Sequence, residues 1–402
     1  MDAKLIDQTM QGYLQNQEMA GGALLVRKNG ELIYRAAWGW SDMEKKKPID
    51  FDSVYRMMSM TKCVTAVAVM QLIEQGKVGL DEPLSCYLPA FDRMQVCTDP
   101  RYTELEGMEP ALLLPKLLPK LLTFDMKKVK TVPADRPITI RDLLSHSSGL
   151  EQGVVGLLAM LKDKRPVESL ARQAEKYASY VLGFQPGTGT GYSPVAGFDV
   201  LGRVVEVVSG LPLDQYLQEN LFQPLEMHST TFHPSGDVAA RLVRVYRRKK
   251  NRLADVTGTK DDMDGILHRC PGYLAACGGL FSTVEDYEKF AWMLCAEGRY
   301  QEQQILQPET VRLMAAEAPA LHLEPEPGQV WGLGVRIRQD PLRGGSPCTP
   351  GTYGWSGAFG THFFVSPADR LDAVWVTNRT DLGGSGSYIS KRVEELVFGC
   401  FA

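Results

Sequence analysis

The stretch that decides the fold is Tyr55-Arg56-Met57-Met58-Ser59-Met60-Thr61-Lys62-Cys63-Val64-Thr65. It continues into an apolar run that closes at Gln75-Gly76-Lys77, made of Val64, Val67, Ala68, Met70, Leu72 and Ile73. This spacing predicts a buried helix with Ser59 and Lys62 in its first turn and Gly76 as its C-terminal stop. Side chains at i and i+3 share one helix face, so the lysine ammonium can reach the serine hydroxyl.

A serine beside a buried lysine at a helix N-terminus suits nucleophilic catalysis. We predict that burial lowers the pKa of Lys62 toward that of a usable base, and that free backbone N–H groups face a developing oxyanion. The alternative interpretation is a helix-capping Ser59 with an incidental lysine one turn later. The tetrapeptide alone does not separate these two interpretations, so other parts of the chain must decide between them.

The composition describes a globular chain. It has 402 residues, of which 44% are hydrophobic and 23% charged, enough to build a large core. A formal net charge of −4 gives no general attraction to nucleic acid or anionic membranes. The eight cysteines include no C-x-x-C pair, which indicates free thiols in a reducing compartment. No signal peptide or long apolar span is visible, so we expect a soluble cytoplasmic protein without a membrane span.

Strand patterns lie at both ends of the chain and helix patterns lie between them. Two strand-like runs, Gly21–Lys28 and Glu31–Gly39, are joined by Asn29-Gly30, the strongest short signal for a hairpin. Further strands are expected at 330–338, 354–365 and 371–377, with a closing helix at about 389–398. Helices are expected at 139–145, 153–163, 167–181, 196–208 and 213–221. This order predicts one sheet completed by the two termini around an inserted helical region.

Residues 95–135 form the irregular part of this pattern. The apolar run 112–122 contains Pro115 and Pro119, and we expect these prolines to prevent one continuous helix. The segment is either an apolar flap over a substrate entrance or a surface insertion packed on the body, and we favour the insertion.

Two further stretches complete a chemical constellation. Tyr192 lies in a glycine-rich loop, Pro186–Pro194, just before the helix expected at 196–208. Trp355-Ser356-Gly357-Ala358 lies at the start of an expected strand. Taken in order, Ser59-x-x-Lys62, Tyr192-Ser193 and Trp355-Ser356-Gly357 resemble the three motifs of the serine β-lactamase and penicillin-binding-protein superfamily. The set is most similar to the class C β-lactamase-like branch with family VIII carboxylesterases and related acyltransferases.

The resemblance covers nearly the whole chain, and Leu143–Leu150, Gly278–Thr283 and Trp331–Gly334 look like further landmarks of the family. It implies an α+β, β-lactamase/transpeptidase-like fold, with an antiparallel sheet of about five strands built from both termini and flanked by helices. We expect a single domain, 1–402. Its α/β subdomain would span 1–80 and 275–402, and its mostly α-helical inserted subdomain would span 81–274.

The resemblance also implies roles for the site residues. Ser59 would attack an acyl carbonyl, and Lys62 with Tyr192 would form the base system, either of them being the formal base. The backbone N–H groups of Ser59 and Ala358 would form the oxyanion hole. Trp355, Ser356 and Gly357 would line the substrate-binding side.

The sequence departs from the lactamase pattern at two places. Trp355 stands where lactamases and peptidases usually have a lysine whose charge meets the substrate carboxylate, and a Trp has no cation. Pro194 stands where an asparagine amide is usual. Both changes favour a neutral ester over an anionic β-lactam.

Other candidate groups receive structural interpretations. His146 is favoured as a structural residue over a general base. The basic cluster between Arg241 and Arg252 is interpreted as an exposed hairpin rather than a nucleic-acid site. No histidine spacing indicates a metal, no cofactor is expected, and no feature indicates an oligomeric state.

The sequence therefore predicts a serine hydrolase that cleaves small-molecule carboxylic esters through an acyl-Ser59 intermediate. An acyltransferase with the same site is the near alternative, and a β-lactamase or D-stereospecific peptidase is the second. The alternative outside enzymes is a sensor that is acylated without turnover, or a silent scaffold.

Overall fold

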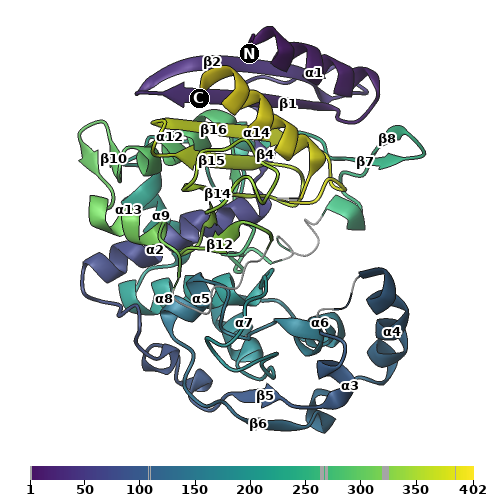
Figure 1. The fold of residues 1–402 in the computed structure, drawn as a ribbon, viewed down its shortest axis with the longest axis vertical. Helices are drawn as coiled ribbons and strands as arrows, with labels where there is room; N and C mark the ends of the chain where they lie inside the picture. Colours follow the sequence, from purple (N-terminus) through teal and green to yellow (C-terminus); the bar gives the residue numbers. More distant parts are fainter. Residues whose placement is uncertain are drawn as a thin grey trace.

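One antiparallel sheet joins strands from the two ends of the chain (Figure 1). The structure, a computed structural model, describes residues 2–106, 108, 110–262, 267, 270–318, 326–384 and 386–402. Within these ranges the sheet has eight strands in the order β12-β13-β14-β15-β16-β1-β2-β3. Their bounds are β1 Gly21–Lys28, β2 Glu31–Asp42, β3 Lys47–Pro48, β12 Gln329–Trp331, β13 Arg336–Arg338, β14 Thr352–Ser356, β15 His362–Ser366 and β16 Leu371–Thr377.

The sheet built from both termini is confirmed, but the expected number of about five strands is too low. The segment predicted at 330–338 folds back at Gly334, whose φ is 79°, and the one at 354–365 folds back at Gly360, whose φ is 87°. Each is therefore a two-strand hairpin, since glycine tolerates this left-handed backbone without steric cost. The two-residue strand β3 adds a further edge strand.

The β1–β2 hairpin forms as predicted. Its turn residues Asn29 and Gly30 have φ values of 54° and 88°, the left-handed conformations that a two-residue hairpin turn requires. On its other side β1 pairs with β16, with Leu24 opposite Trp375. The first and last parts of the chain therefore share the middle of the sheet.

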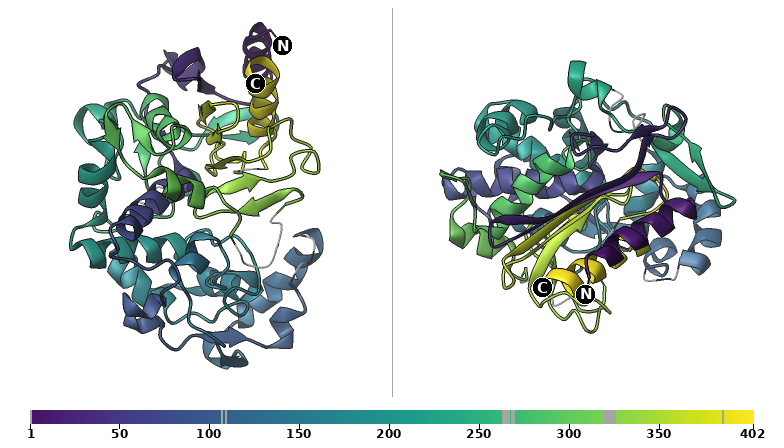
Figure 2. Two further views of the ribbon diagram at one scale, coloured as in Figure 1. Left: turned by 60° about the vertical axis from the view of Figure 1, so that its left-hand side comes forward. Right: turned by 90° about the horizontal axis from the view of Figure 1, so that it is seen from above.

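Helices cover both faces of the sheet (Figure 2). On one face α1 (Lys4–Gln15) and α14 (Tyr388–Phe401) lie over a cluster that includes Leu24 and Val26 of β1. On the other face α12 (Val284–Cys295) packs against β1, β15 and β16. Leu25, which alternates with Leu24 and Val26 along β1, belongs to the larger cluster there, as the two-residue period of a strand requires.

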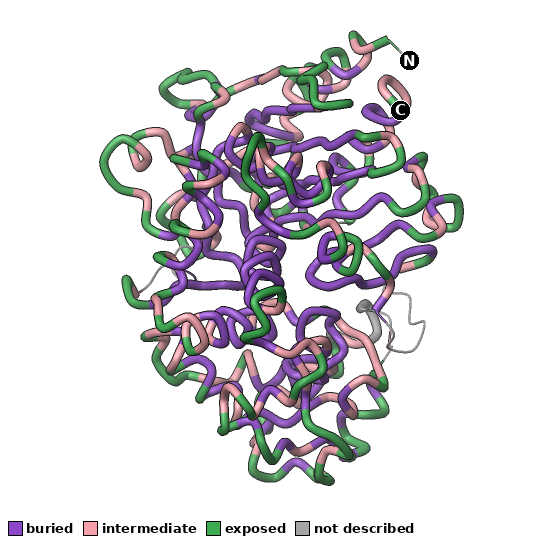
Figure 3. The backbone as a smooth tube through the Cα atoms, turned by 90° about the vertical axis from the view of Figure 1, so that its left-hand side faces the viewer, coloured by how far each residue is buried: buried purple, intermediate pink, exposed green. Residues whose placement is uncertain are grey.

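The helix α2 (Thr61–Glu74) is the buried axis of the molecule. Its residues 61–72 are all buried, and Figure 3 shows that the buried segments lie in the interior of the molecule. A helix that is apolar on every side has to be surrounded by protein, and α2 packs against α8 (Ala196–Ser209). The predicted buried helix and its stop at Gly76, whose φ is 66°, are confirmed, but the helix begins at Thr61, so Ser59 lies in the turn before it rather than in its first turn.

The helices predicted between the terminal strands are present. Their bounds are α5 Ile140–Leu144, α6 Gly153–Lys162, α7 Leu170–Tyr177, α8 Ala196–Ser209 and α9 Leu213–Leu217. Two more helices follow later in the chain, α10 Gly236–Ala240 and α13 Pro308–Met314. We propose that 81–274 form the inserted helical subdomain and that 1–80 with 275–402 form the α/β part.

The expectation for the prolines of residues 95–135 is wrong. The helix α4 (Pro110–Thr123) runs through both Pro115 and Pro119. The two prolines are four residues apart and both are exposed, so they share the outer face of the helix and lie outside the core. The rest of the segment contains α3 (Pro100–Thr103) and a small ladder of β5 (Gln95–Cys97) with β6 (Thr131–Pro133).

The basic cluster forms the hairpin that the sequence predicts, with strands β7 (Tyr246–Lys249) and β8 (Arg252–Asp255). Some of its charges are balanced, since Arg244 pairs with Asp255 and Arg247 pairs with Asp261.

Among the residues that the structure describes, no helix has the length and apolar character needed to cross a membrane.

Candidate active site

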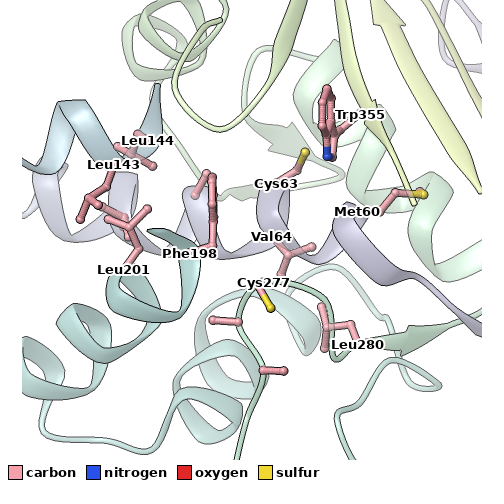
Figure 4. Close-up of a cluster of buried hydrophobic side chains, with 14 of the residues drawn as sticks. Met60, Cys63, Val64, Leu143, Leu144, Phe198, Leu201, Cys277, Leu280 and Trp355 are labelled. Atoms are coloured by element: carbon pink, nitrogen blue, oxygen red, sulfur yellow. The ribbon is translucent and has the colours of Figure 1, made fainter. Parts of the chain in front are cut away.

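Ser59 lies in a short 3₁₀ turn, Met58–Met60, that leads directly into α2. Met58 has a φ of 51°, an unfavourable value for a side chain of this kind, so the turn is held by its surroundings. The helix behind it is fixed by apolar contacts, because Cys63 and Val64 of α2 lie among Phe198, Cys277 and their neighbours (Figure 4). Ser59 therefore stands on a rigid support.

Gly357 explains how β14 can come close to this turn. A side chain at this position would overlap the carbonyl oxygen of Met57 and the hydroxyl of Thr361. The third motif needs glycine here because only a hydrogen atom fits between the strand and the turn that carries Ser59.

Three predicted side chains converge at the floor of a cavity. The Tyr192 hydroxyl donates a hydrogen bond of 2.8 Å to Ser59 Oγ, and Lys62 Nζ lies 3.4 Å from the same oxygen. Lys62 Nζ also lies 5.2 Å from the centre of the Tyr192 ring. Two potential proton acceptors thus lie within reach of one hydroxyl, the geometry that nucleophilic catalysis by serine requires.

The prediction that burial lowers the pKa of Lys62 is wrong in its net direction. Lys62 is 1% exposed, and this burial does act to lower its pKa. Tyr192 and Cys277 act in the opposite direction and raise the pKa above its ordinary value. The ammonium also donates hydrogen bonds of 2.7 Å to the carbonyl oxygens of Pro194 and Cys277. Lys62 is therefore held as a cation.

A buried acid lies behind this cation. Asp199 on α8 accepts hydrogen bonds from the Tyr273 hydroxyl at 2.5 Å and from the backbone N–H of Cys277 at 3.1 Å. Burial raises the pKa of Asp199 to about 6. Since the carbonyl of the same Cys277 accepts from Lys62, this one residue links the carboxylate to the ammonium.

Aromatic rings hold Tyr192 in place. Its ring stacks on Trp331 at 6.2 Å with planes 11° apart, and it also contacts Trp355 at 5.3 Å and His146 at 4.9 Å. His146 Nδ1 accepts a hydrogen bond of 3.2 Å from the backbone N–H of Ser193. Burial lowers the pKa of His146 well below its ordinary value, so the ring is neutral and acts as a support for the tyrosine loop.

Glu151 is a support that the sequence reasoning missed. This buried carboxylate accepts hydrogen bonds from the Ser193 hydroxyl at 3.0 Å and from the backbone N–H groups of Val195 at 2.9 Å and Ala196 at 2.6 Å. It therefore caps the start of α8 and fixes the loop that carries Tyr192. In the sequence, only its position next to the landmark Leu143–Leu150 could have indicated that Glu151 belongs to the site.

The third motif has a buried relay behind it. Ser356 Oγ lies 2.7 Å from His362 Nδ1, and His362 Nε2 lies 2.9 Å from Glu394 Oε1 on α14. Arg338 on β13 donates to the same carboxylate oxygen at 2.5 Å. Ser356 and His362 face each other in the β14–β15 ladder, which is why a turn of five residues brings them together. Glu394 and Arg338 were not predicted as site residues.

The cavity above Ser59 has a volume of about 470 Å³. Its lining residues are Ser59, Thr190, Gly191, Tyr192, Glu326, Trp331, Arg336, Trp355, Ser356, Ala358, Gly384 and Gly386. Lys62 and Gly357 lie behind this wall. No described residue of 95–135 belongs to the lining, which agrees with a surface insertion rather than a flap.

The cavity nevertheless contains a cation, although Trp355 supplies none. Arg336 on β13 lies in its wall with its guanidinium 5.2 Å from the Trp355 ring. The neutral-ester prediction considered only Trp355 and Pro194 and did not foresee this positive charge, so the charge of the ester stays a prediction. Strand β13 brings Arg336 to the site opposite Gly354, and motif spacing does not reveal such a neighbour.

Comparison with known proteins identifies the family of this arrangement. The Beta-lactamase family profile matches residues 6–397. The chain belongs to this family. Esterase EstB of Burkholderia gladioli is 27% identical to it over 404 residues, which cover 96% of this chain and 92% of the relative. The lovastatin esterase of Penicillium rubens is 30% identical over 333 residues, which cover 80% of this chain and 73% of the relative.

A solved structure agrees with this assignment. EstCE1, described as a hydrolase with promiscuous acyltransferase activity, matches with a TM-score of 0.78 at 26% identity, covering 99% of this chain and 98% of its own. The predicted resemblance, the β-lactamase/transpeptidase-like fold and the assignment as a β-lactamase-like serine hydrolase are confirmed.

Proposed function

We propose that the protein hydrolyses carboxylic esters of small molecules through an acyl-Ser59 intermediate. The observation that carries this proposal is the 2.8 Å contact of Tyr192 with Ser59 Oγ at the floor of the cavity, with Lys62 at 3.4 Å. Relatives named as esterases support the ester as the substrate class.

Tyr192 is the proposed base, because Lys62 is held as a cation by two carbonyl acceptors and is a poor proton acceptor in that state. As the phenolate, Tyr192 takes the Ser59 proton while the Oγ–C bond to the acyl carbonyl forms. The ammonium of Lys62, 5.2 Å from the Tyr192 ring, stabilises that phenolate. Tyr192 then returns the proton to the leaving alcohol.

The proposed oxyanion hole consists of the backbone N–H groups of Ser59 and Ala358. Both residues line the cavity, one at the start of a helix and the other just after the end of β14. Water then attacks the acyl carbonyl while Tyr192 takes its proton, and Tyr192 returns this proton to Ser59 Oγ as the Oγ–C bond breaks and the acid is released.

Acyl transfer to an alcohol is the second candidate for the last step. The similarity to EstCE1, a hydrolase with promiscuous acyltransferase activity, favours it. An added alcohol acceptor separates the two, because transfer diverts acyl groups from the free acid to a new ester.

Turnover of p-nitrophenyl butyrate tests the proposal. We expect release of p-nitrophenol by the wild-type protein and none above background by Ser59→Ala. Equal rates for the two proteins would contradict it. A cytoplasmic location is part of the proposal, supported by eight cysteines that are all free thiols in the structure.

A further inference from the structure

One charged side chain of the cavity has no task in the proposed mechanism. Arg336 is 5% exposed, lines the cavity together with Ser59, and stacks against the Trp355 ring at 5.2 Å. The ring holds the guanidinium by a cation–π contact but does not neutralise its charge. A buried charge of this kind normally has a hydrogen-bonded counter-ion.

The one carboxylate that forms an ion pair with Arg336, among the described residues, is an incomplete partner. Glu326 Oε2 lies 3.7 Å from the guanidinium, beyond hydrogen-bonding distance, and accepts instead from Gln329 Nε2 at 3.1 Å. No described residue accepts a hydrogen bond from Arg336. A guanidinium carries five N–H donors, so this planar group offers unused donors to the cavity.

Glu394, a buried acid whose charge also acts on Arg336, is already occupied by other partners. Glu394 Oε1 takes both Arg338 and His362, and its Oε2 lies 3.3 Å from the Ser346 hydroxyl. Burial, followed by the charge of Arg338, lowers the pKa of Arg336 to about 10, against the opposite pull of Glu326 and Glu394. Arg336 is therefore still a cation at neutral pH, and its charge is only partly balanced.

The two indoles that line the cavity beside Arg336 cannot accept a hydrogen bond from it. The N–H groups of Trp331 and Trp355 only donate, and both are buried without an acceptor among the described residues. The planar fork of a guanidinium matches a carboxylate with two parallel hydrogen bonds.

We propose that the cavity takes esters that carry a carboxylate, and that Arg336 binds this group. The inference rests on the proposed function, because it names the substrate class of the same site. It places a positive subsite on β13, whereas the sequence pattern favoured a neutral ester. The carboxylate belongs either to the acyl part or to the alcohol part of the ester, and two pairs of substrates distinguish these sources.

The first pair is the p-nitrophenyl monoester of glutarate and its neutral methyl ester, with the carboxylate on the acyl side. The second pair is 4-butyryloxybenzoate and its methyl ester, with the carboxylate on the alcohol side. After subtraction of the Ser59→Ala background, we expect one pair to show a kcat/KM about 10- to 100-fold higher for the charged member.

Variants assign this preference to Arg336. In Arg336→Met we expect the charged-to-neutral ratio to fall to about one. Arg312→Met is the matched control, since Arg312 is an exposed arginine of α13 paired with Glu297 and Glu309, and it keeps the ratio. Glu326→Gln removes the competing carboxylate and raises the ratio.

The outcomes separate this inference from the proposed function. Turnover of neutral esters with no preference in either pair overturns the carboxylate subsite and leaves the esterase proposal intact. A preference that survives Arg336→Met also overturns the subsite. Absence of turnover for all four esters contradicts the proposed function itself. If Arg336→Met does not fold, Arg336→Lys takes its place, because it keeps the positive charge but loses the planar pair of donors. We then expect a smaller preference for the charged ester. An unchanged charged-to-neutral ratio in both Arg336→Lys and Glu326→Gln overturns the inference.

Discussion

Lys62 donates a hydrogen bond of 2.7 Å to the carbonyl oxygen of Cys277, a residue 215 positions later in the chain. An equal bond to the carbonyl of Pro194 completes a pair of acceptors around the buried ammonium. Both bonds favour the charged form, in agreement with a pKa of Lys62 that is raised in spite of its burial. A fixed cation stabilises a phenolate better than it accepts a proton, and for this reason we propose Tyr192 as the base.

Replacement of Lys62 tests its role as that cation. In Lys62→Met we expect kcat/KM for p-nitrophenyl butyrate to fall by about 10²- to 10⁴-fold, because Tyr192 loses the charge that stabilises its phenolate. Lys391→Met, at an exposed position of α14, is the control and should keep the wild-type rate. A Lys62→Met protein with more than a tenth of the wild-type kcat/KM would contradict this role.

Removal of one hydroxyl tests the base. In Tyr192→Phe we expect kcat/KM to fall by about 10²- to 10⁴-fold while the melting temperature changes little, because Tyr192 is 38% exposed and its ring keeps its contacts with Trp331 and His146. Tyr388→Phe removes a hydroxyl from a tyrosine of similar exposure, 45%, outside the cavity. Equal kcat/KM values for Tyr192→Phe and Tyr388→Phe would contradict the role of Tyr192 as the base.

Local patterns identified the residues that share a site but left their chemical states undetermined. Ser59, Tyr192 and Trp355 were found from motif order, because each lies at a fixed place on a helix, a loop or a strand. The charged state of Lys62 depends on carbonyl groups of Pro194 and Cys277, which only the folded chain brings together. The burial of Lys62 was predictable from the apolar pattern. The partners that reverse the effect of burial on its pKa were not.

Residues that reach the site across the sheet were missed for the same reason. Arg336 comes to the cavity because β13 pairs with β14, with Arg336 opposite Gly354. Glu394 lies on the last helix, and no periodic pattern in the sequence predicts its contact with His362. For α4 the error was local, since two exposed prolines on a surface helix interrupt less than the same residues in a buried one.

Asp199 makes stability depend on pH in an unusual direction. Its pKa of about 6 in the folded protein is higher than the ordinary value of 3.8, so the folded state binds more protons than the unfolded state between these values. The stabilising contribution of Asp199 to the free energy of unfolding is therefore present below about pH 4 and is lost as the pH rises through about 6. We expect wild type to lose about 3 kcal/mol relative to Asp199→Asn over this range.

Urea unfolding at several pH values between about 4 and 7 measures this difference. The comparison of the two proteins removes the contributions of the other carboxylates, since those are common to both. Parallel stability curves for wild type and Asp199→Asn would show that Asp199 ionises normally and would contradict the prediction.

Glu394 stabilises the fold in the opposite pH direction. Burial acts to raise its pKa, but His362 and Arg338 outweigh burial and lower it, so its contribution is present above the ordinary value and is lost as the pH falls through the lowered one. In Glu394→Gln we expect a loss of about 3–5 kcal/mol at pH 7, because Arg338 then remains as a buried charge without its counter-ion.

The neighbouring residue provides the control for this change. Glu395 is 44% exposed and pairs with Arg392 at 2.7 Å on the surface of the same helix. We expect Glu395→Gln to change the free energy of unfolding by less than about 1 kcal/mol. Urea unfolding of both variants at neutral pH measures the contrast, and equal effects would mean that the buried pair is no more important than the surface pair.

Trapping of the acyl-enzyme is the most direct test of Ser59 as the nucleophile. The protein is mixed with p-nitrophenyl butyrate, quenched with acid within the first turnovers, digested and analysed by mass spectrometry. We expect one butyryl group on the peptide that contains Ser59, formed together with a burst of p-nitrophenol, and no such group in Ser59→Ala. Ester turnover that persists in Ser59→Ala, or a butyryl group on another residue that turns over at the steady-state rate, would contradict catalysis through Ser59.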